Sequence, residues 1–189
     1  LMDDVGSLPL MAILSKAPNI LAEGEVLQLS NLANLDLSEK KYREIIRCKT
    51  ALLFEAATHS AAVLSKPDGT EKEVIDDLRK FGLHFGVAYQ LIDDWLDYAG
   101  DSGTMGKNTG DDLAEGKMTL PLILALQNAT EREQACLSNA IRNRSASEAT
   151  RVIEIVNDSG ALELTRKSAM EEIQQARDTL RHVEPSIYK

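Results

Sequence analysis

The stretch AYQLIDDWLDYAGD, residues 88–101, places three aspartates at the end of a helix that is otherwise apolar. No Lys or Arg occurs within residues 88–101 to pair with Asp93, Asp94 or Asp97. Because carboxylates that lack a partner repel one another, we expect something outside this stretch to neutralise them.

The spacing of these aspartates suits a metal ion. On a regular helix, residues four apart lie about 40° apart around the axis, and residues three apart lie about 60° apart. Asp93 and Asp97 therefore share one face, Asp94 flanks it, and Gln90 lies one turn earlier. Mg²⁺ takes oxygen ligands and keeps several waters, so two carboxylates one turn apart suit it. A solvated acidic helix end explains the same pattern equally well.

The context of the motif favours a binding site over a solvated helix end. The residues before it are mostly apolar, which indicates a buried helix: Phe81, Leu83, Phe85, Val87, Leu91 and Ile92. Two lysines flanked by glycine follow, Lys107 in MGKN and Lys117 in EGKM. Basic residues on a glycine-rich loop near metal-bound carboxylates are what a diphosphate requires, although each lysine alone would be interpreted as a surface charge.

On both sides of this stretch, the chain consists of long segments that contain few helix-breaking residues such as proline and glycine. We see no strand pattern, and the predicted fold class is all-α: a single domain over residues 1–189, built as a bundle of long antiparallel helices. Ser38 is a predicted N-cap, Thr70 and Glu73 a predicted capping box, and Pro18 a break or a helix start. Residues 100–117 are expected to form a loop, and helices are expected at about 8–34, 38–65, 70–98, 119–127, 130–142, 145–157 and 161–183.

Composition narrows the function classes. Across the 189 residues the net charge is −9, and an acidic chain is a poor general binder of nucleic acids. Cys48 and Cys136 are interpreted as reduced thiols, and the histidines lack metal-ligand spacing. No run of about 18 apolar residues predicts a membrane span. We expect a cytoplasmic protein.

Two further segments complete a recognisable series. They are AEGEVLQL at residues 22–29 and CKTALLFEAA at residues 48–57, and both precede YQLIDDWLDYAGD and MGKNTGDDLAEGKMTLPLI. In this order, the segments resemble the motifs of the trans-isoprenyl diphosphate synthases over essentially the whole chain. The subgroup that the chain resembles most is the long-chain bacterial polyprenyl synthases, such as the octaprenyl diphosphate synthases that make the ubiquinone side chain.

The resemblance implies an isoprenoid-synthase bundle and a role for each matching residue. Asp93, Asp94 and Asp97 match the second aspartate-rich motif, which binds Mg²⁺, and Asp93 is the expected direct ligand. The remaining matches are Lys49, Gln90, Lys107 and Lys117 for the substrate diphosphate, Thr50 and Gln90 near the reacting carbons, and Gln28 facing the cavity. Asp111 and Asp112 receive no direct role.

The implied activity is condensation of isopentenyl diphosphate onto an allylic diphosphate, with farnesyl diphosphate expected, to give a long all-trans polyprenyl diphosphate. The resemblance also implies a homodimer. The sequence does not fix the length of the product.

The chain departs from the family at its start. Ser7 stands where a first motif beginning at Asp3 and Asp4 would need its third acid, and no Arg pair follows. We therefore expect the N-terminal helices, the first aspartate-rich motif and the isopentenyl diphosphate site to lie outside these residues, which should be inactive alone. A non-catalytic or regulatory subunit of a heteromeric synthase is the alternative. A terpene cyclase fits less well, because its second metal motif differs from DDWLD.

Overall fold

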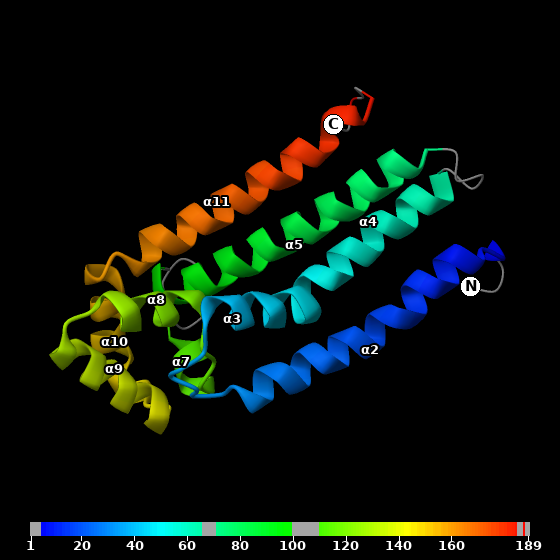
Figure 1. Ribbon diagram of the computed structural model, residues 1–189. Coiled ribbons are helices and arrows are strands. Elements are labelled where there is room, and N and C mark those ends of the chain that lie inside the picture. Colours follow the sequence, from blue (N-terminus) through cyan, green and yellow to red (C-terminus); the bar gives the residue numbers. More distant parts are fainter. Residues whose placement is uncertain (1–4, 66–70, 100–109, 185–186, 188–189) are drawn as a thin grey trace.

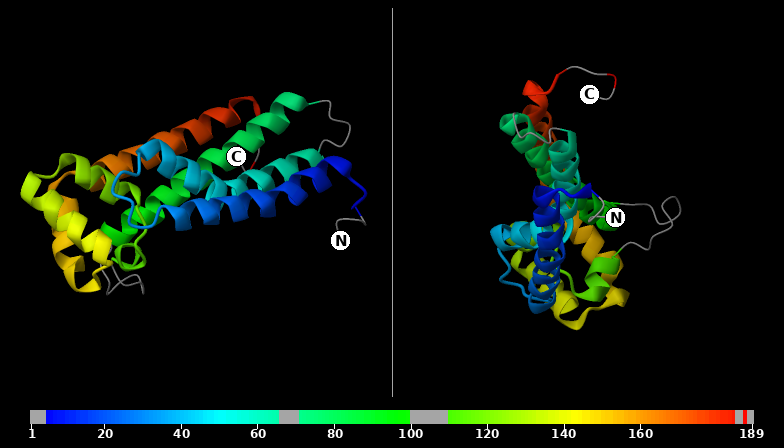
Figure 2. Two further views of the ribbon diagram at one scale, coloured as in Figure 1. Left: turned by 60° about the horizontal axis from the view of Figure 1, so that its bottom comes forward. Right: turned by 90° about the vertical axis from the view of Figure 1, so that its right-hand side faces the viewer.

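The computed structural model describes residues 5–65, 71–99, 110–184 and 187, and every regular element in this part of the chain is a helix. The long helices lie lengthwise beside one another (Figure 1): α2 (Leu8–Ser30), α4 (Leu52–Ser65), α5 (Lys72–Ala99) and α11 (Ala161–Thr179). Shorter helices gather at one end of this bundle, as Figure 1 and the left view in Figure 2 show: α7 (Asp111–Glu115), α8 (Leu120–Asn128), α9 (Glu131–Asn143) and α10 (Ala149–Asp158). The predicted all-α fold class is confirmed.

Side-chain caps set several helix boundaries. The Ser38 hydroxyl accepts a hydrogen bond from the Lys41 backbone N–H at 3.2 Å, as predicted, and α3 (Glu39–Ile46) begins there. A capping box of Thr130 and Glu133 opens α9. The capping box predicted at Thr70 lies outside the described residues.

The break predicted at Pro18 is wrong, because α2 continues through this residue. A proline inside a helix removes one backbone hydrogen bond. Packing on either side outweighs that loss, since Leu10, Ala17 and Gly24 are buried against the rest of the bundle.

The long helix expected over residues 38–65 is interrupted by a π-helical turn, Arg47–Ala51, between α3 and α4. Two glycines lie against this turn. A Cβ added to Gly24 of α2 would lie 2.8 Å from the Lys49 backbone nitrogen, and one added to Gly86 of α5 would lie 2.5 Å from the Ala51 Cα. Only a residue without a side chain allows both neighbouring helices to approach the turn so closely.

The segment expected to be a loop up to residue 117 contains the short helix α7. Gly110 (φ 87°) and Gly116 (φ 74°) flank it in the left-handed conformation that glycine adopts without strain. Five residues are too few to show helical periodicity, so the pattern did not reveal α7. Leu113 on α7 is buried in the core.

The core lies where the short helices meet α5 and α11. Fully buried side chains from four elements pack there: Leu91, Leu120, Leu122, Leu137, Ile141, Val152, Ile155 and Val156. The acidic end of α5 is embedded in this core, because Tyr98 is only 2 % exposed. Within the described residues, no helix combines the length and apolar character needed to cross a membrane.

We predict that Gly86→Ala destabilises the protein, because the new methyl group would meet the Ala51 backbone and force α5 away from the π turn. Overpacking of this kind costs about 1–3 kcal/mol in the free energy of unfolding. Urea unfolding measures the change. Lys167→Ala, on an exposed part of α11, is the control and should shift stability by no more than about 0.5 kcal/mol. A Gly86→Ala variant as stable as the parent would show that the contact is easily relaxed.

Candidate functional site

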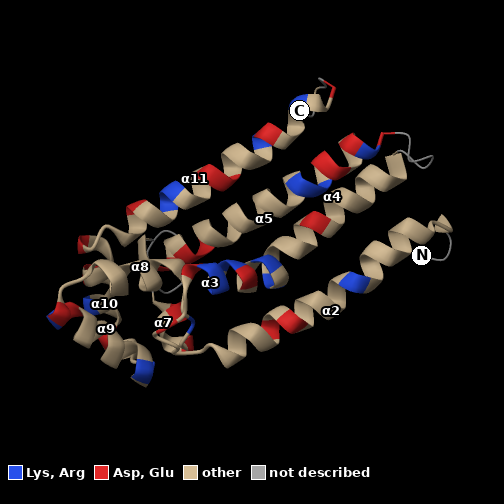
Figure 3. Ribbon diagram, in the orientation of Figure 1, with Lys and Arg blue, Asp and Glu red and all other residues tan. Residues whose placement is uncertain are grey.

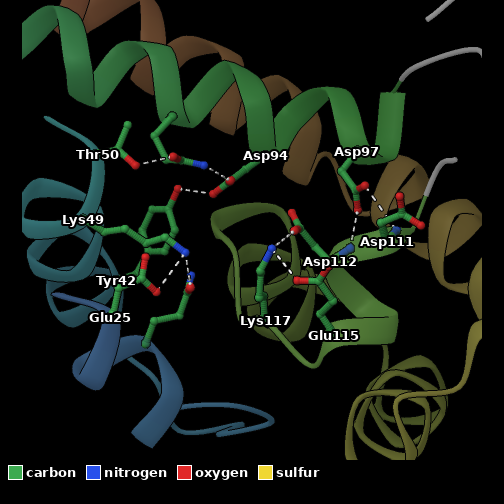
Figure 4. A network of polar contacts seen from close by, with 12 residues as sticks. Glu25, Tyr42, Lys49, Thr50, Asp94, Asp97, Asp111, Asp112, Glu115 and Lys117 are labelled. Carbon is green, nitrogen blue, oxygen red and sulfur yellow. Dashed lines mark hydrogen bonds and ion pairs between the residues drawn. The ribbon is translucent and has the colours of Figure 1, made fainter. Parts of the chain in front are cut away.

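A cavity of about 180 Å³ opens between α2, the π turn, α5 and the segment around α7. Figure 4 shows its polar side chains converging from these elements. The structure brings most of the predicted site residues to its wall: Gln28, Lys49, Thr50, Gln90, Asp93, Asp94 and Lys117. Asp97 does not line the cavity, and Lys107 lies outside the described residues.

Asp94 is the most buried of the acids, with 3 % of its surface exposed. Its Oδ2 accepts a hydrogen bond from the Tyr42 hydroxyl at 2.5 Å, and its Oδ1 accepts one from Gln90 Nε2 at 2.7 Å. Gln90 Oε1 in turn accepts a hydrogen bond from the Thr50 hydroxyl at 2.6 Å. A chain of hydrogen bonds therefore runs from α3 through α5 to the π turn.

Asp97 makes its hydrogen bonds to a different element, the helix α7. Its two carboxylate oxygens accept hydrogen bonds from the backbone N–H groups of Asp111 and Asp112, each at 3.2 Å. These are the first N–H groups of α7, which have no partner inside the helix. Asp97 thus caps α7 from a neighbouring helix.

Asp93 and Asp112 are the carboxylates that face the cavity beside Asp94. Lys117 lies next to Asp112, with its Nζ 3.3 Å from Asp112 Oδ1 and 2.6 Å from Glu115 Oε2. Figure 3 shows this concentration of acidic positions on α7 and at the end of α5. The cavity wall therefore combines carboxylates with at least one ammonium group on a flexible side chain, that of Lys117.

Lys49 supplies a second ammonium group from the opposite wall. Its Nζ donates to Gln28 Oε1 at 2.5 Å and lies 3.4 Å from Glu25 Oε2, and both partners belong to α2. The π turn places Lys49 and Thr50 on the cavity wall, where they face different helices. Single π turns inside helices occur frequently at functional sites.

Burial and mutual repulsion raise the pKa values of the carboxylates. Burial, and next the Asp112 charge, raise the pKa of Asp94 to about 7, although the hydrogen bonds from Tyr42 and Gln90 oppose the shift. Burial and Asp112 likewise raise the pKa of Asp97 to about 6. Burial also raises the pKa of Asp112, against the influence of Lys117. The negative charge of this cluster is therefore only partly compensated by the described protein groups.

The side chains around the cavity have the right chemistry for a divalent cation, but they do not form a complete set of metal ligands. No group of three or more His, Cys, Asp or Glu side chains in the described part of the chain is arranged to hold a metal ion. Asp93, Asp94 and Asp112 nevertheless offer oxygen donors to one cavity, where their charges repel each other. A hard cation that keeps water and takes further oxygens from a phosphate suits such a partial set.

An apolar groove adjoins the cavity at Asp93. It runs along α5 and is lined by Phe85, Ala88, Tyr89, Ile92, Asp93, Leu96 and, from α11, Ile173. Phe85 and Tyr89 are 38 % and 56 % exposed. Both pack on Phe54: the centroid of its ring lies 5.3 Å from that of Phe85 and 5.4 Å from that of Tyr89. Asp93 lines both the polar cavity and this groove.

Sequence reasoning missed Tyr42, Glu25 and the cavity position of Asp112. Tyr42 precedes Lys49 by seven residues, a spacing that places two side chains on one face of a regular helix, so a signal was present. The contact of Tyr42 with Asp94 spans 52 positions and could not be inferred from spacing.

The described helices thus form a bundle with an acid-lined cavity beside an apolar groove. Comparison with known proteins gives the particular family. The model of the polyprenyl synthetase family matches residues 1–158. The chain belongs to this family.

Individual relatives agree with this assignment. The all-trans-nonaprenyl-diphosphate synthase (geranyl-diphosphate specific) of Rhodobacter capsulatus is 43% identical over 190 residues, which cover 100% of this chain and 57% of the relative. Octaprenyl diphosphate synthase of Escherichia coli is 42% identical over 177 residues, covering 93% of this chain and 54% of the relative. The chain thus spans about half the length of the curated relatives it matches.

A solved structure shows the same fold. The polyprenyl synthase of Caulobacter crescentus, crystallised with calcium and isoprenyl diphosphate, aligns with a TM-score of 0.88 and 41% sequence identity. The alignment covers 95% of this chain and 54% of the crystallised one.

We predict a pH dependence of stability that Asp94 dominates when divalent cations are removed with a chelator. The folded-state pKa of about 7 lies above the usual carboxyl value of 3.8, so the folded protein binds more protons than the unfolded chain between these values. Stability should therefore fall as the pH rises from about 4 to about 7, by a few kcal/mol at about 1.4 kcal/mol per unit of pKa.

Urea unfolding across this pH range measures the effect, with Asp94→Asn beside the parent. The asparagine cannot ionise, so its free energy of unfolding should fall less steeply with pH. Asp158→Asn, at an exposed position on α10, is the control and should keep the parent's slope. Parallel curves for the parent and Asp94→Asn would refute the assignment.

Proposed function

We propose that this chain forms part of a chain-elongating prenyltransferase that condenses isopentenyl diphosphate onto an allylic diphosphate and makes a long all-trans polyprenyl diphosphate. The position of Asp93, at the junction of the polar cavity and the apolar groove, carries this proposal. An allylic diphosphate has the same division, a highly charged head joined to an apolar tail. The family membership supports the same conclusion.

In the proposed mechanism, the cavity holds the diphosphate head. Lys49 and Lys117 approach it from opposite walls, and both can exchange their present carboxylate or amide partners for phosphate oxygens. On the cavity wall, Asp93, Asp94 and Asp112 would hold Mg²⁺. Asp97 belongs to the same motif and is proposed as a further ligand, although in this structure it caps α7. The bound cation would neutralise the diphosphate so that it can leave. Lys107, outside the described residues, is proposed as a further diphosphate ligand.

The reaction itself exchanges one bond for another. The allylic C–O bond breaks, and the electron pair leaves with the diphosphate. The alkene of isopentenyl diphosphate attacks the resulting allylic cation, a C–C bond forms, and loss of a proton restores an alkene. Thr50 and Gln90 line the cavity, and the Thr50 carbonyl and the Gln90 side chain are proposed to stabilise the developing positive charge with their dipoles.

The finer assignments belong to the same proposal. Octaprenyl diphosphate for a quinone side chain is the proposed product, farnesyl diphosphate the proposed primer, and a homodimer the proposed assembly. We further propose that residues 1–189 are inactive alone, because they lack a complete first aspartate-rich motif. A non-catalytic subunit is the competing proposal, and an activity assay of the intact protein separates the two.

We predict that the protein as its gene encodes it, with Mg²⁺, farnesyl diphosphate and labelled isopentenyl diphosphate, forms a ladder of products that ends near the octaprenyl chain. Asp93→Ala should reduce turnover on the order of a hundredfold or more, because the head group loses charge compensation. Asp158→Ala is the matched control, since this aspartate is exposed at the end of α10.

Chromatography of the extracted, dephosphorylated products measures both rate and chain length. Incorporation that persists in Asp93→Ala would contradict the assigned role. Absence of incorporation by the intact protein, with restored activity after a second protein is added, would favour the subunit proposal.

We predict a separate effect in the groove. Phe85→Ser should raise KM for a twenty-carbon allylic diphosphate by about tenfold and leave KM for a ten-carbon one nearly unchanged, because only the longer tail would reach Phe85. Leu164→Ser replaces a similarly exposed apolar side chain on α11 outside the groove and serves as the control. Equal changes in both KM values would mean that the tail takes another path.

A further inference from the structure

Tyr42 is buried at the wall of the cavity, although it belongs to no motif discussed above. It lies on α3 with 2 % of its surface exposed, and its hydroxyl donates to Asp94 Oδ2. Figure 4 shows the ring beneath α5 with its hydroxyl pointing at this carboxylate. A phenol is seldom buried without a partner, and here its partner is a carboxylate of the acidic motif.

The contact fixes more than one side chain. Because Tyr42 occupies Oδ2 of Asp94, the other oxygen remains directed at Gln90 Nε2. This fixes the Gln90 amide with its oxygen toward Thr50, which donates to it. The orientation of Thr50 and of the turn that carries it is thus coupled to a hydroxyl on the preceding helix.

A second contact holds α3 in place to make this possible. Arg43, the residue after Tyr42, lies 2.9 Å from Glu172 on α11, and the other carboxylate oxygen of Glu172 lies 2.7 Å from His84 Nδ1 on α5. Tyr42 and Arg43 therefore anchor α3 to α5 through two different routes. Both routes keep α3 where the Tyr42 hydroxyl reaches Asp94.

We propose that Tyr42 is a positioning residue: its hydroxyl locks Asp94 and, through Gln90 and Thr50, sets the relative orientation of the acidic turn of α5 and the π turn. This inference deepens the proposed function and rests on it for its kinetic consequences. Without the hydroxyl, Asp94 would be a buried carboxylate with an unsatisfied oxygen, free to turn away from Gln90.

The test compares Tyr42→Phe with Tyr98→Phe in the protein as its gene encodes it. Both substitutions remove one buried hydroxyl and keep the ring. The Tyr98 hydroxyl, however, lies beside Thr119, and in the described residues it makes no hydrogen bond to Asp93, Asp94 or Asp97. Tyr42→Phe should lower kcat/KM by about tenfold to a hundredfold, which corresponds to a hydrogen bond to a charged group, whereas Tyr98→Phe should change it less than about twofold.

A double-mutant cycle separates positioning from general stability. If Tyr42 acts through Asp94, Tyr42→Phe should lower kcat/KM much less in an Asp94→Asn background than in the parent. An equal loss in both backgrounds, or a Tyr42→Phe variant that keeps the parent's kcat/KM, would overturn the inference. Urea unfolding of each variant shows that the comparison is made between folded proteins.

A binding measurement distinguishes failure of this inference from failure of the proposed function. Calorimetry with Mg²⁺ and inorganic diphosphate requires no turnover, and Tyr42→Phe should bind this pair about tenfold more weakly than Tyr98→Phe does. If the parent shows no turnover but the binding difference holds, the proposed reaction fails and the role of Tyr42 stands. If the two variants bind equally, the role of Tyr42 fails whatever the reaction is.

Discussion

The close approach of two helix backbones to one π-helical turn determines the shape of the cavity. Gly24 of α2 and Gly86 of α5 press on the turn from different sides, at distances that exclude even a methyl group. A π turn has one residue more than the regular helix would have, and it changes the direction in which the following side chains point. Lys49 therefore reaches α2, while the adjacent Thr50 reaches α5. The π turn thus carries two adjacent side chains that line one cavity and contact two different helices.

The second constraint is electrostatic. The acids of α5 lie where helices pack around them, and in the described residues the contacts of Asp94 and Asp97 are hydrogen bonds from neutral groups. Neutral donors orient a carboxylate but do not cancel its charge, so the raised pKa values remain. The fold thus retains negative charge in a confined space. A multivalent cation bound there would neutralise this charge with little change in the packing of the helices.

The sequence was sufficient for the fold class and for most of the residues that meet at the cavity. Helical spacing and caps such as Ser38 predicted the long helices, because these signals are local. Ordered motifs placed Lys49, Gln90 and Asp93 in one site. The interruption after α3 was not predicted, because it depends on contacts with Gly24 and Gly86 that lie far away in the sequence. The helix α7 was missed because its ends depend on two left-handed glycines and a cap from Asp97.

The three aspartates of the motif DDWLD, which are Asp93, Asp94 and Asp97, lie against three different parts of the molecule. Asp94 turns inward to α3, Asp97 holds the first turn of α7, and Asp93 lies at the boundary between the cavity and the groove. Successive residues on a helix point about 100° apart, so neighbouring acids are directed to different elements even within one turn. A spacing that suits a metal ion therefore also joins α3 and α7 to α5. The cavity and the helices that form it depend on the same few carboxylates, which explains why such a dense acidic motif can be stable inside a helical core.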